Sequence, residues 1–189
     1  LFRSAHFGLL SCGASIDLIR AAKAKGLPVT ADVAMHQLHL TEQLTDGFNS
    51  LAHVRPPLRS EQDKALLRQG LKEGVIDAIC THHEPLSSSA KMAPFAETQP
   101  GITAFDTYVG LGVQLIQEGV FDALEWVEKV TLNPAKVANM TERWKQEAGW
   151  VLIDPELEWT VSKETILSQG KNTPLLGQTL KGKVLQTFI

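Results

Sequence analysis

Three polar side chains that can bind a metal ion or move a proton follow directly after a short apolar run. The run, residues 75–80, is rich in β-branched residues, which is typical of a buried parallel strand. His82, His83 and Glu84 come at its carboxyl end, where parallel α/β proteins normally place their chemistry. The sequence therefore predicts a candidate metal site here, although adjacent side chains point in different directions. An ordinary loop with two solvated histidines is the alternative.

Two more histidines follow another predicted strand, residues 27–33. His36 and His39 are three positions apart, so a zinc pair is conceivable. The loop positions of a former site explain this pair better. His6, inside an earlier predicted strand, fits a core or loop histidine.

Two arginines flank a pair of prolines. Arg55 and Arg59 enclose the sequence Pro56-Pro57-Leu58. Consecutive prolines exclude a helix interior and a central strand, so we expect an ordered extended loop. The guanidinium groups could bind a carboxylate or phosphate in a bidentate manner. The alternative is that Arg59 anchors the proline loop.

The composition narrows the classes of protein that this chain can belong to. It has 189 residues, 43% hydrophobic and 21% charged, with a net charge of -3, which is typical of a globular protein. We expect no nucleic-acid partner, and no apolar run approaches the ~20 residues of a membrane span. The first residues do not resemble a signal peptide. Cys12 and Cys80 lack CxxC spacing, so small buried residues in a cytoplasmic protein without disulfides are expected.

These side chains must be positioned by an alternating set of strands and helices. Ser15 is a candidate helix N-cap, and Gly26 follows the basic last turn of that helix. Ser60 is a candidate cap for a second helix, with Ala65, Leu66, Leu67 and Leu71 facing inward. Strands are predicted at residues 5–10, 27–33 and 75–80. The order β-α-β-loop-α-β predicts right-handed parallel crossovers.

The second half of the chain is predicted to be helical before it becomes β-structured. A long loop over residues 87–100 is typical of a functional segment or a lid. Helices are expected at 103–118 and 121–130, and a third is expected to begin at Asn133-Pro134-Ala135. Short strands at 151–154, 158–161 and 184–189 predict a small β appendage. We therefore divide the chain into residues 1–149 and 150–189. Packing in helices or the appendage explains the four tryptophans, Trp126, Trp144, Trp150 and Trp159.

Several short motifs together resemble the dihydroorotases of the amidohydrolase superfamily. Members carry a proline-proline-leucine-arginine loop, matched by residues 56–59, and a T-D-H-A-P-H motif, matched by residues 81–86. Pro94-Phe95, Pro100-Gly101 and Asn133-Pro134-Ala135 resemble further family segments. So does Lys171-Asn172-Thr173-Pro174 with Gly177 and Gly182. The resemblance implies the C-terminal part of a TIM-type (β/α)8 amidohydrolase barrel with a small β-sandwich appendage. The chain also lacks an initial Met and opens in a predicted strand, which agrees with that expectation.

The sequence departs from the family pattern at positions that bind metal or substrate in the family. Family members use metal ions, usually zinc, to activate water, with an aspartate that His82 replaces here. Leu9 stands where the family has a metal-binding histidine, and Leu86 replaces a substrate-contacting histidine. Arg55 stands where the family usually has a substrate-contacting asparagine. His36 matches the first of two family histidines, and glutamine follows it in place of the second.

The resemblance with these losses implies a catalytically degenerate dihydroorotase-like protein without a cofactor. Such family members assemble or stabilise aspartate transcarbamoylase, the enzyme that precedes dihydroorotase in pyrimidine biosynthesis. The alternative is an active zinc-dependent dihydroorotase, which interconverts carbamoyl-aspartate and dihydroorotate. Its metal would be held by His82, His83 or His36 together with a His-x-His motif and a carboxylated lysine on earlier strands. A third hypothesis is a small-anion binding module that uses Arg55 and Arg59. Open strand edges also predict self-association.

Overall fold

Three short parallel strands form the central sheet of the protein. The computed structural model describes residues 4–147 and 149–188. β1 (Ala5–Phe7), β2 (Val29–Ala34) and β3 (Ala78–Cys80) lie side by side in the order β1-β2-β3. Both strand pairs are parallel, so the predicted β-α-β-loop-α-β order is confirmed. Within the described residues β1 and β3 each pair on one side only, and this part of the chain contains no closed barrel.

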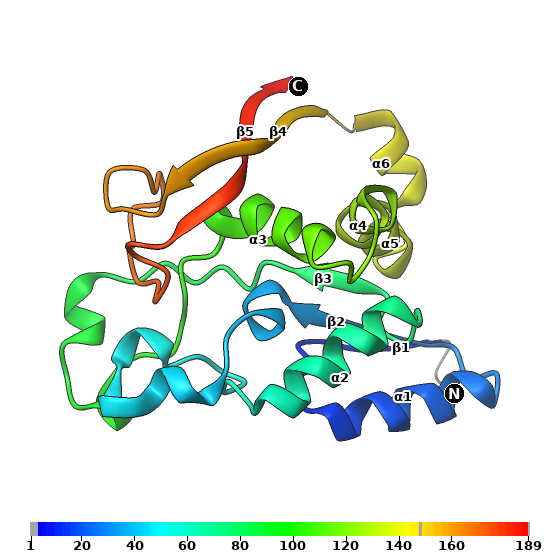
Figure 1. Ribbon diagram of the computed structural model, residues 1–189. Helices are drawn as coiled ribbons and strands as arrows, with labels where there is room; N and C mark the ends of the chain where they lie inside the picture. The colour runs from blue at the N-terminus through cyan, green and yellow to red at the C-terminus, as the bar shows by residue number, and fades with distance from the viewer. Residues whose placement is uncertain (1–3, 148, 189) are drawn as a thin grey trace.

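Two helices connect these strands, and one carboxylate joins their starts. α1 (Gly13–Ala24) and α2 (Glu61–Lys72) pack against each other (Figure 1). The hydroxyl of Ser60 accepts a hydrogen bond from the Asp63 N–H, as predicted for a cap. The carboxylate of Asp63 accepts another from the Gly13 N–H at 2.8 Å. The predicted cap at Ser15 is therefore wrong, because Asp63 of α2 serves the first turn of α1.

The outer strands are shorter than the sequence suggested. The N–H groups of Val75 and Ile76 both donate to the Gly70 carbonyl. These residues therefore close α2, and the strand begins only at Ala78. In the predicted strand 5–10, Leu9 adopts φ 57°. Its N–H donates to the Asp32 side chain, which bends the chain out of the sheet after Phe7.

The hydrophobic core lies where β2 meets α1 and α2. Val33 of β2, Ile16 of α1 and Leu67 of α2 are almost fully buried and belong to one cluster. Each such aliphatic side chain contributes about 1.5–3 kcal/mol when it leaves water. Ala65 and Leu66, which we predicted to face inward, lie exposed on α2 instead.

Short 3-10 turns fill the long connections at the carboxyl ends of the strands. They are η1 (Met35–Leu38), η2 (Glu42–Phe48), η3 (Ser50–Ala52), η4 (Ser88–Lys91) and η5 (Phe95–Glu97). The ammonium group of Lys91 donates to the carbonyls of His53 and Gln99. It therefore ties the loop after β3 to the proline loop after β2.

Four helices follow the third strand. They are α3 (Phe105–Gln117), α4 (Ala123–Val130), α5 (Leu132–Val137) and α6 (Thr141–Glu147). The first three were predicted, and α6 was not. Lys129 of α4 and Asn133 of α5 donate to the carbonyls of Ile76 and Asp77, which holds this helical layer against β3. None of the described helices is long and apolar enough to cross a membrane.

The chain ends in a two-stranded antiparallel ribbon. β4 (Trp150–Thr160) and β5 (Thr179–Phe188) pair along most of their length. We predicted separate strands at 151–154 and 158–161, but a single strand spans both because the register shifts between Asp154 and Glu158. We predicted a β-sandwich segment here, and the described residues form this two-stranded ribbon. It lies on α3, where Gly110 allows Leu180 and Lys181 of β5 to approach closely.

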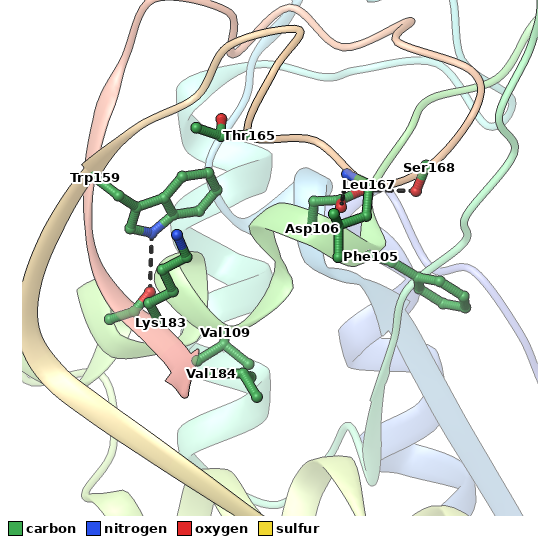
Figure 2. Close-up of a pocket in the computed structure, with 10 residues that line it drawn as sticks. Phe105, Asp106, Val109, Trp159, Thr165, Leu167, Ser168, Lys183 and Val184 are labelled. Atoms are coloured by element: carbon green, nitrogen blue, oxygen red, sulfur yellow. Dashed lines mark hydrogen bonds between the residues drawn. The ribbon is translucent and has the colours of Figure 1, made fainter. Parts of the chain in front are cut away.

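The connection between the ribbon strands is fastened to the first turn of α3 (Figure 2). Both oxygens of the Asp106 carboxylate are engaged at 2.6 Å, by the Leu167 N–H and the Ser168 hydroxyl. The Trp159 indole donates to the Gly182 carbonyl at 3.0 Å. The ammonium of Lys183 lies 5.7 Å from the centre of the indole ring. These groups border a pocket of about 360 Å³. Their polar atoms are already engaged in the contacts just described.

Candidate functional site

His36 and His82 come together at the carboxyl ends of two adjacent strands. His36 lies on η1, directly after β2, and His82 follows β3. Their ring centroids are 5.7 Å apart, with 24° between the ring planes. His82 reaches this position with a left-handed backbone, φ 46°, a conformation that is uncommon in a residue with a side chain. The carboxyl ends of β2 and β3 therefore bring these two histidines together.

The electrostatics of His36 are those of a buried neutral imidazole. Its side chain is 1% exposed, and neither ring nitrogen has a hydrogen-bond partner among the described residues. Burial, and to a lesser extent the nearby His82, lower the pKa of His36 to about 3. A general base works best with a pKa near the operating pH. His36 is therefore a poor proton carrier at neutral pH.

The two ring nitrogens of His82 differ in their surroundings. Its Nε2 atom lies 3.5 Å from a carboxylate oxygen of Glu84. Its Nδ1 atom is buried and has no hydrogen-bond partner among the described residues. The resemblance implies a carboxylate at this position, and an imidazole would offer a neutral or cationic group where the metal-assisted reaction needs an anionic one.

His83 turns away from this pair and caps a helix. Its Nδ1 atom accepts hydrogen bonds from the N–H groups of Ala104 and Phe105, at 3.0 and 3.1 Å. The first N–H groups of a helix have no partner within the helix, and His83 supplies one for α3. The imidazole also stacks on Phe105, with centroids 4.0 Å apart and planes 1° apart. Burial lowers the pKa of His83. The proposed ligand set of His36, His82 and His83 is therefore divided between two places.

His39 does not form a pair with His36 either. Burial lowers its pKa to about 4, and the positive charge of Arg68 acts in the same direction. Its Nε2 atom is buried without a hydrogen-bond partner. Arg68 itself is engaged by the Leu38 carbonyl and the Glu118 carboxylate. His39 therefore belongs to the packing between η1, α2 and α3.

Asp32, which our sequence interpretation missed, connects all three strands. It accepts hydrogen bonds from the Leu9 N–H and the His6 imidazole, both at 2.8 Å, and its Oδ1 lies 3.4 Å from Cys80 Sγ. Burial and the Asp32 charge raise the pKa of the Cys80 thiol. His6 also bonds to the Thr30 hydroxyl, so it is a strand residue rather than a core or loop histidine. A carboxylate within the apolar run 27–33 was the only sequence signal for this cluster.

The arginines of the proline loop point to no partner in the described part of the protein. Arg55 and Arg59 are exposed, and no ion pair joins either to a described carboxylate. Gln37 fixes the loop instead: its amide donates to the Pro56 and Pro57 carbonyls at 3.1 and 3.3 Å. Gln37 is 2% exposed. The structural anchor of this loop is therefore Gln37, and the arginine side chains are free to meet solvent or a ligand.

Comparison with known proteins identifies relatives of the whole chain. No family model matches it. A dihydroorotase-like protein of Pseudomonas aeruginosa is 40% identical over 188 residues, which are 98% of this chain and 44% of the relative. A dihydroorotase of Syntrophus aciditrophicus is 37% identical over 187 residues, again 44% of its length. The chain is homologous to dihydroorotases and dihydroorotase-like proteins. It spans somewhat less than half of their length.

Solved structures with a similar fold include hydantoinases and a dihydroorotase-like domain. A D-hydantoinase (dihydropyrimidinase) from a Thermus species superimposes with a TM-score of 0.86 at 22% identity, over 98% of this chain and 43% of the other. The inactive dihydroorotase-like domain of a multifunctional protein from Chaetomium thermophilum gives 0.71 at 22% identity, over 99% and 50%. The expected α/β amidohydrolase fold is therefore confirmed.

The zinc that the resemblance implies for an active relative can be tested against the donors of this chain. A zinc site takes three or four protein ligands. Residues 4–147 and 149–188 contain no group of three histidine, cysteine, aspartate or glutamate side chains placed to hold a metal ion. His36 and His82 supply two imidazoles, while Leu9 brings only its backbone N–H to Asp32. The described residues do not fit zinc by themselves.

The buried side-chain amide of Asn172 holds the loop that carries Glu84 and Leu86. Sequence analysis did not identify this residue as part of the site. Asn172, on the connection between β4 and β5, accepts from the Leu86 N–H and donates to the carbonyls of Glu84 and Gly101. Its oxygen also accepts from the Thr103 hydroxyl. The ribbon connection therefore positions the far side of the candidate site.

Proposed function

We propose that the protein containing this chain is a catalytically degenerate dihydroorotase homologue that serves as an assembly or stabilising subunit for aspartate transcarbamoylase. The His36–His82 pair is the observation that supports the first part of this proposal, the loss of catalytic activity. An imidazole with a pKa of about 3 faces another imidazole in the place of a metal-binding carboxylate. Among the described residues the carboxylate paired with this site is that of Glu84, which lies 3.5 Å from Nε2 of His82 and has a side chain that is 46% exposed. We take this solvated carboxylate as a poor substitute for a metal-binding one that also accepts the proton of the attacking water. The assembly role is supported by the resemblance described above.

Dihydroorotate formation from carbamoyl-aspartate tests the first half of the proposal. We expect the full-length protein, at high concentration with zinc supplied, to show no turnover above background. A working dihydroorotase assayed in parallel controls for substrate and metal quality. Turnover that a chelator abolishes would contradict the proposal, because it would require a functioning metal site. After a negative result, light scattering of a mixture with aspartate transcarbamoylase should show a complex larger than either protein.

An active zinc-dependent dihydroorotase is the second candidate function. It is favoured by three buried ring nitrogens without partners, two on His36 and one on His82. Buried polar atoms normally have hydrogen-bond partners, so these nitrogens resemble part of an incomplete ligand set. Residues outside this chain could complete it in the full-length protein. The same turnover assay separates the two candidates.

We also propose that copies of this chain associate through the open edge of its sheet. β1 pairs only with β2 in the described residues, and it carries Phe7 with 47% of its surface exposed. Unpaired strand edges with apolar side chains readily pair with another chain. We expect Phe7→Lys to reduce the mass measured by light scattering at micromolar concentration. Leu18→Lys, at a 72% exposed position on α1, is the matched control. A wild-type mass equal to one chain would overturn the proposal.

A further inference from the structure

We propose that a pocket beside the loop after β3 binds a small molecule that carries a phosphate group on an apolar body. The pocket has a volume of about 500 Å³, which is in the usual range for small-molecule sites. Its walls come from η3, from the loop that contains η4, and from the connection between β4 and β5. The last two segments lie next to each other in Figure 1.

The charge of this pocket is one-sided. Lys91, Lys163 and Lys171 line it, and no aspartate or glutamate does. Among the described residues, none of these lysines has a carboxylate within ion-pair distance. Glu84 acts on Lys91, and Glu164 on the other two lysines, only through space. Three ammonium groups that share one cavity attract a multiply charged anion.

The deepest of the three cations is held in place by the fold. Lys91 is 7% exposed, and its ammonium donates to the carbonyls of His53 at 3.1 Å and Gln99 at 2.7 Å. An ammonium group has three donors, so one N–H remains for a ligand. Lys171 donates to the Ile166 carbonyl and keeps two. Lys163 makes no hydrogen bond within the described part of the chain and keeps three.

The uncharged lining defines the rest of the ligand. Ser88 and Gln169 add donors beside the lysines, and Leu51 and Leu176 form an apolar wall. A phosphate monoester carries about -1.5 to -2 charges at pH 7 and three strong acceptor oxygens. It therefore matches three ammonium groups better than a single carboxylate does, while the apolar wall accommodates an organic body. Of the candidate site residues Leu86 and Asn172 border this pocket, whereas His36 and His82 do not line it, so the inference does not depend on the function proposed above.

Calorimetric titration of the full-length protein with phenyl phosphate tests this proposal. We expect one binding event per chain at low ionic strength, weakened by added salt. Hydrogen bonds to charged groups contribute about 1.5–3 kcal/mol, which is roughly tenfold or more in affinity. Lys163→Gln should therefore weaken binding about tenfold, and the double variant with Lys171→Gln should weaken it further. Lys25→Gln, an exposed lysine on the far end of α1, removes the same charge elsewhere and should leave affinity unchanged.

Several outcomes would overturn the assignment. One is that phenyl phosphate does not bind detectably. Another is that Lys25→Gln loses as much affinity as Lys163→Gln. The third is that benzoate binds as tightly as phenyl phosphate. Lys163→Arg keeps the charge and should retain most of the affinity. Because Lys163 is exposed and unbonded, its replacement should not disturb folding, and a circular dichroism spectrum checks this. The binding result is independent of dihydroorotate turnover, so failure of either proposal can be recognised separately.

Discussion

Replacing Asn172 with alanine is expected to lower the free energy of unfolding by about 3–5 kcal/mol, because each of several buried groups left without a partner costs about 1–3 kcal/mol. The Asn172 side chain is 3% exposed and takes part in four hydrogen bonds. Alanine would leave the Leu86 N–H and the carbonyls of Glu84 and Gly101 without these partners inside the protein. Buried polar groups without partners are costly because they have also lost their water.

Chemical denaturation monitored by tryptophan fluorescence measures this effect. Asn49→Ala is the matched control, because the Asn49 side chain accepts a single bond from the Leu51 N–H at the start of η3. Loss of such a cap costs about 1 kcal/mol. Asn172→Asp is a second useful variant, since a carboxylate keeps the two acceptor contacts and loses both donor contacts. If Asn172→Ala were no more damaging than Asn49→Ala, the network would not hold these loops together.

Acidification from about pH 7 to about pH 5 is expected to destabilise the protein by on the order of 4 kcal/mol through two buried histidines. The pKa of His36 falls from 6.5 to about 3, and that of His39 to about 4. Between these values and 6.5 the unfolded chain binds more protons than the folded one, so stability rises with pH in this window. The stabilising effect is complete above the unfolded pKa and is lost as the pH falls through the window.

The slope of unfolding free energy against pH isolates each histidine. We expect His36→Leu to remove about half of the slope due to this pair, or about 2 kcal/mol over the same interval, and His39→Leu to remove a similar part. Met35→Leu changes a buried neighbour that does not titrate and should leave the slope as it is. An unchanged slope in both histidine variants would mean that these imidazoles take up protons in the folded state.

The order of elements was predictable because its signals are local. Apolar runs, polar strand ends and the Ser60 cap each lie within a few residues of the structure that they specify. Strand lengths were not predictable, since they depend on distant partners: the Gly70 carbonyl captures two N–H groups of the predicted third strand. Helix α6 was missed because its sequence, TERWKQE, has almost no apolar face.

The candidate site was predictable only in part, for the same reason. The sequence placed His36 and His82 after separate parallel strands, and parallel strands bring their carboxyl ends together, which is where the structure has the two rings. The separate role of His83 depends on N–H groups 21 and 22 residues further along the chain. Asn172 acts on a loop 86 residues away. Asp32 was visible in the sequence as a charged residue inside an apolar strand. Its role could not be predicted, because its partners lie on or next to the two neighbouring strands.

The hydrogen bonds of Gln37 have a consequence for the arginines of the proline loop. The Gln37 amide holds the carbonyls of Pro56 and Pro57. A histidine at position 37, which the resemblance to dihydroorotases implies for that family, would lack this amide. We therefore expect Gln37→His to loosen the loop and, with it, the orientation of the exposed guanidinium groups of Arg55 and Arg59.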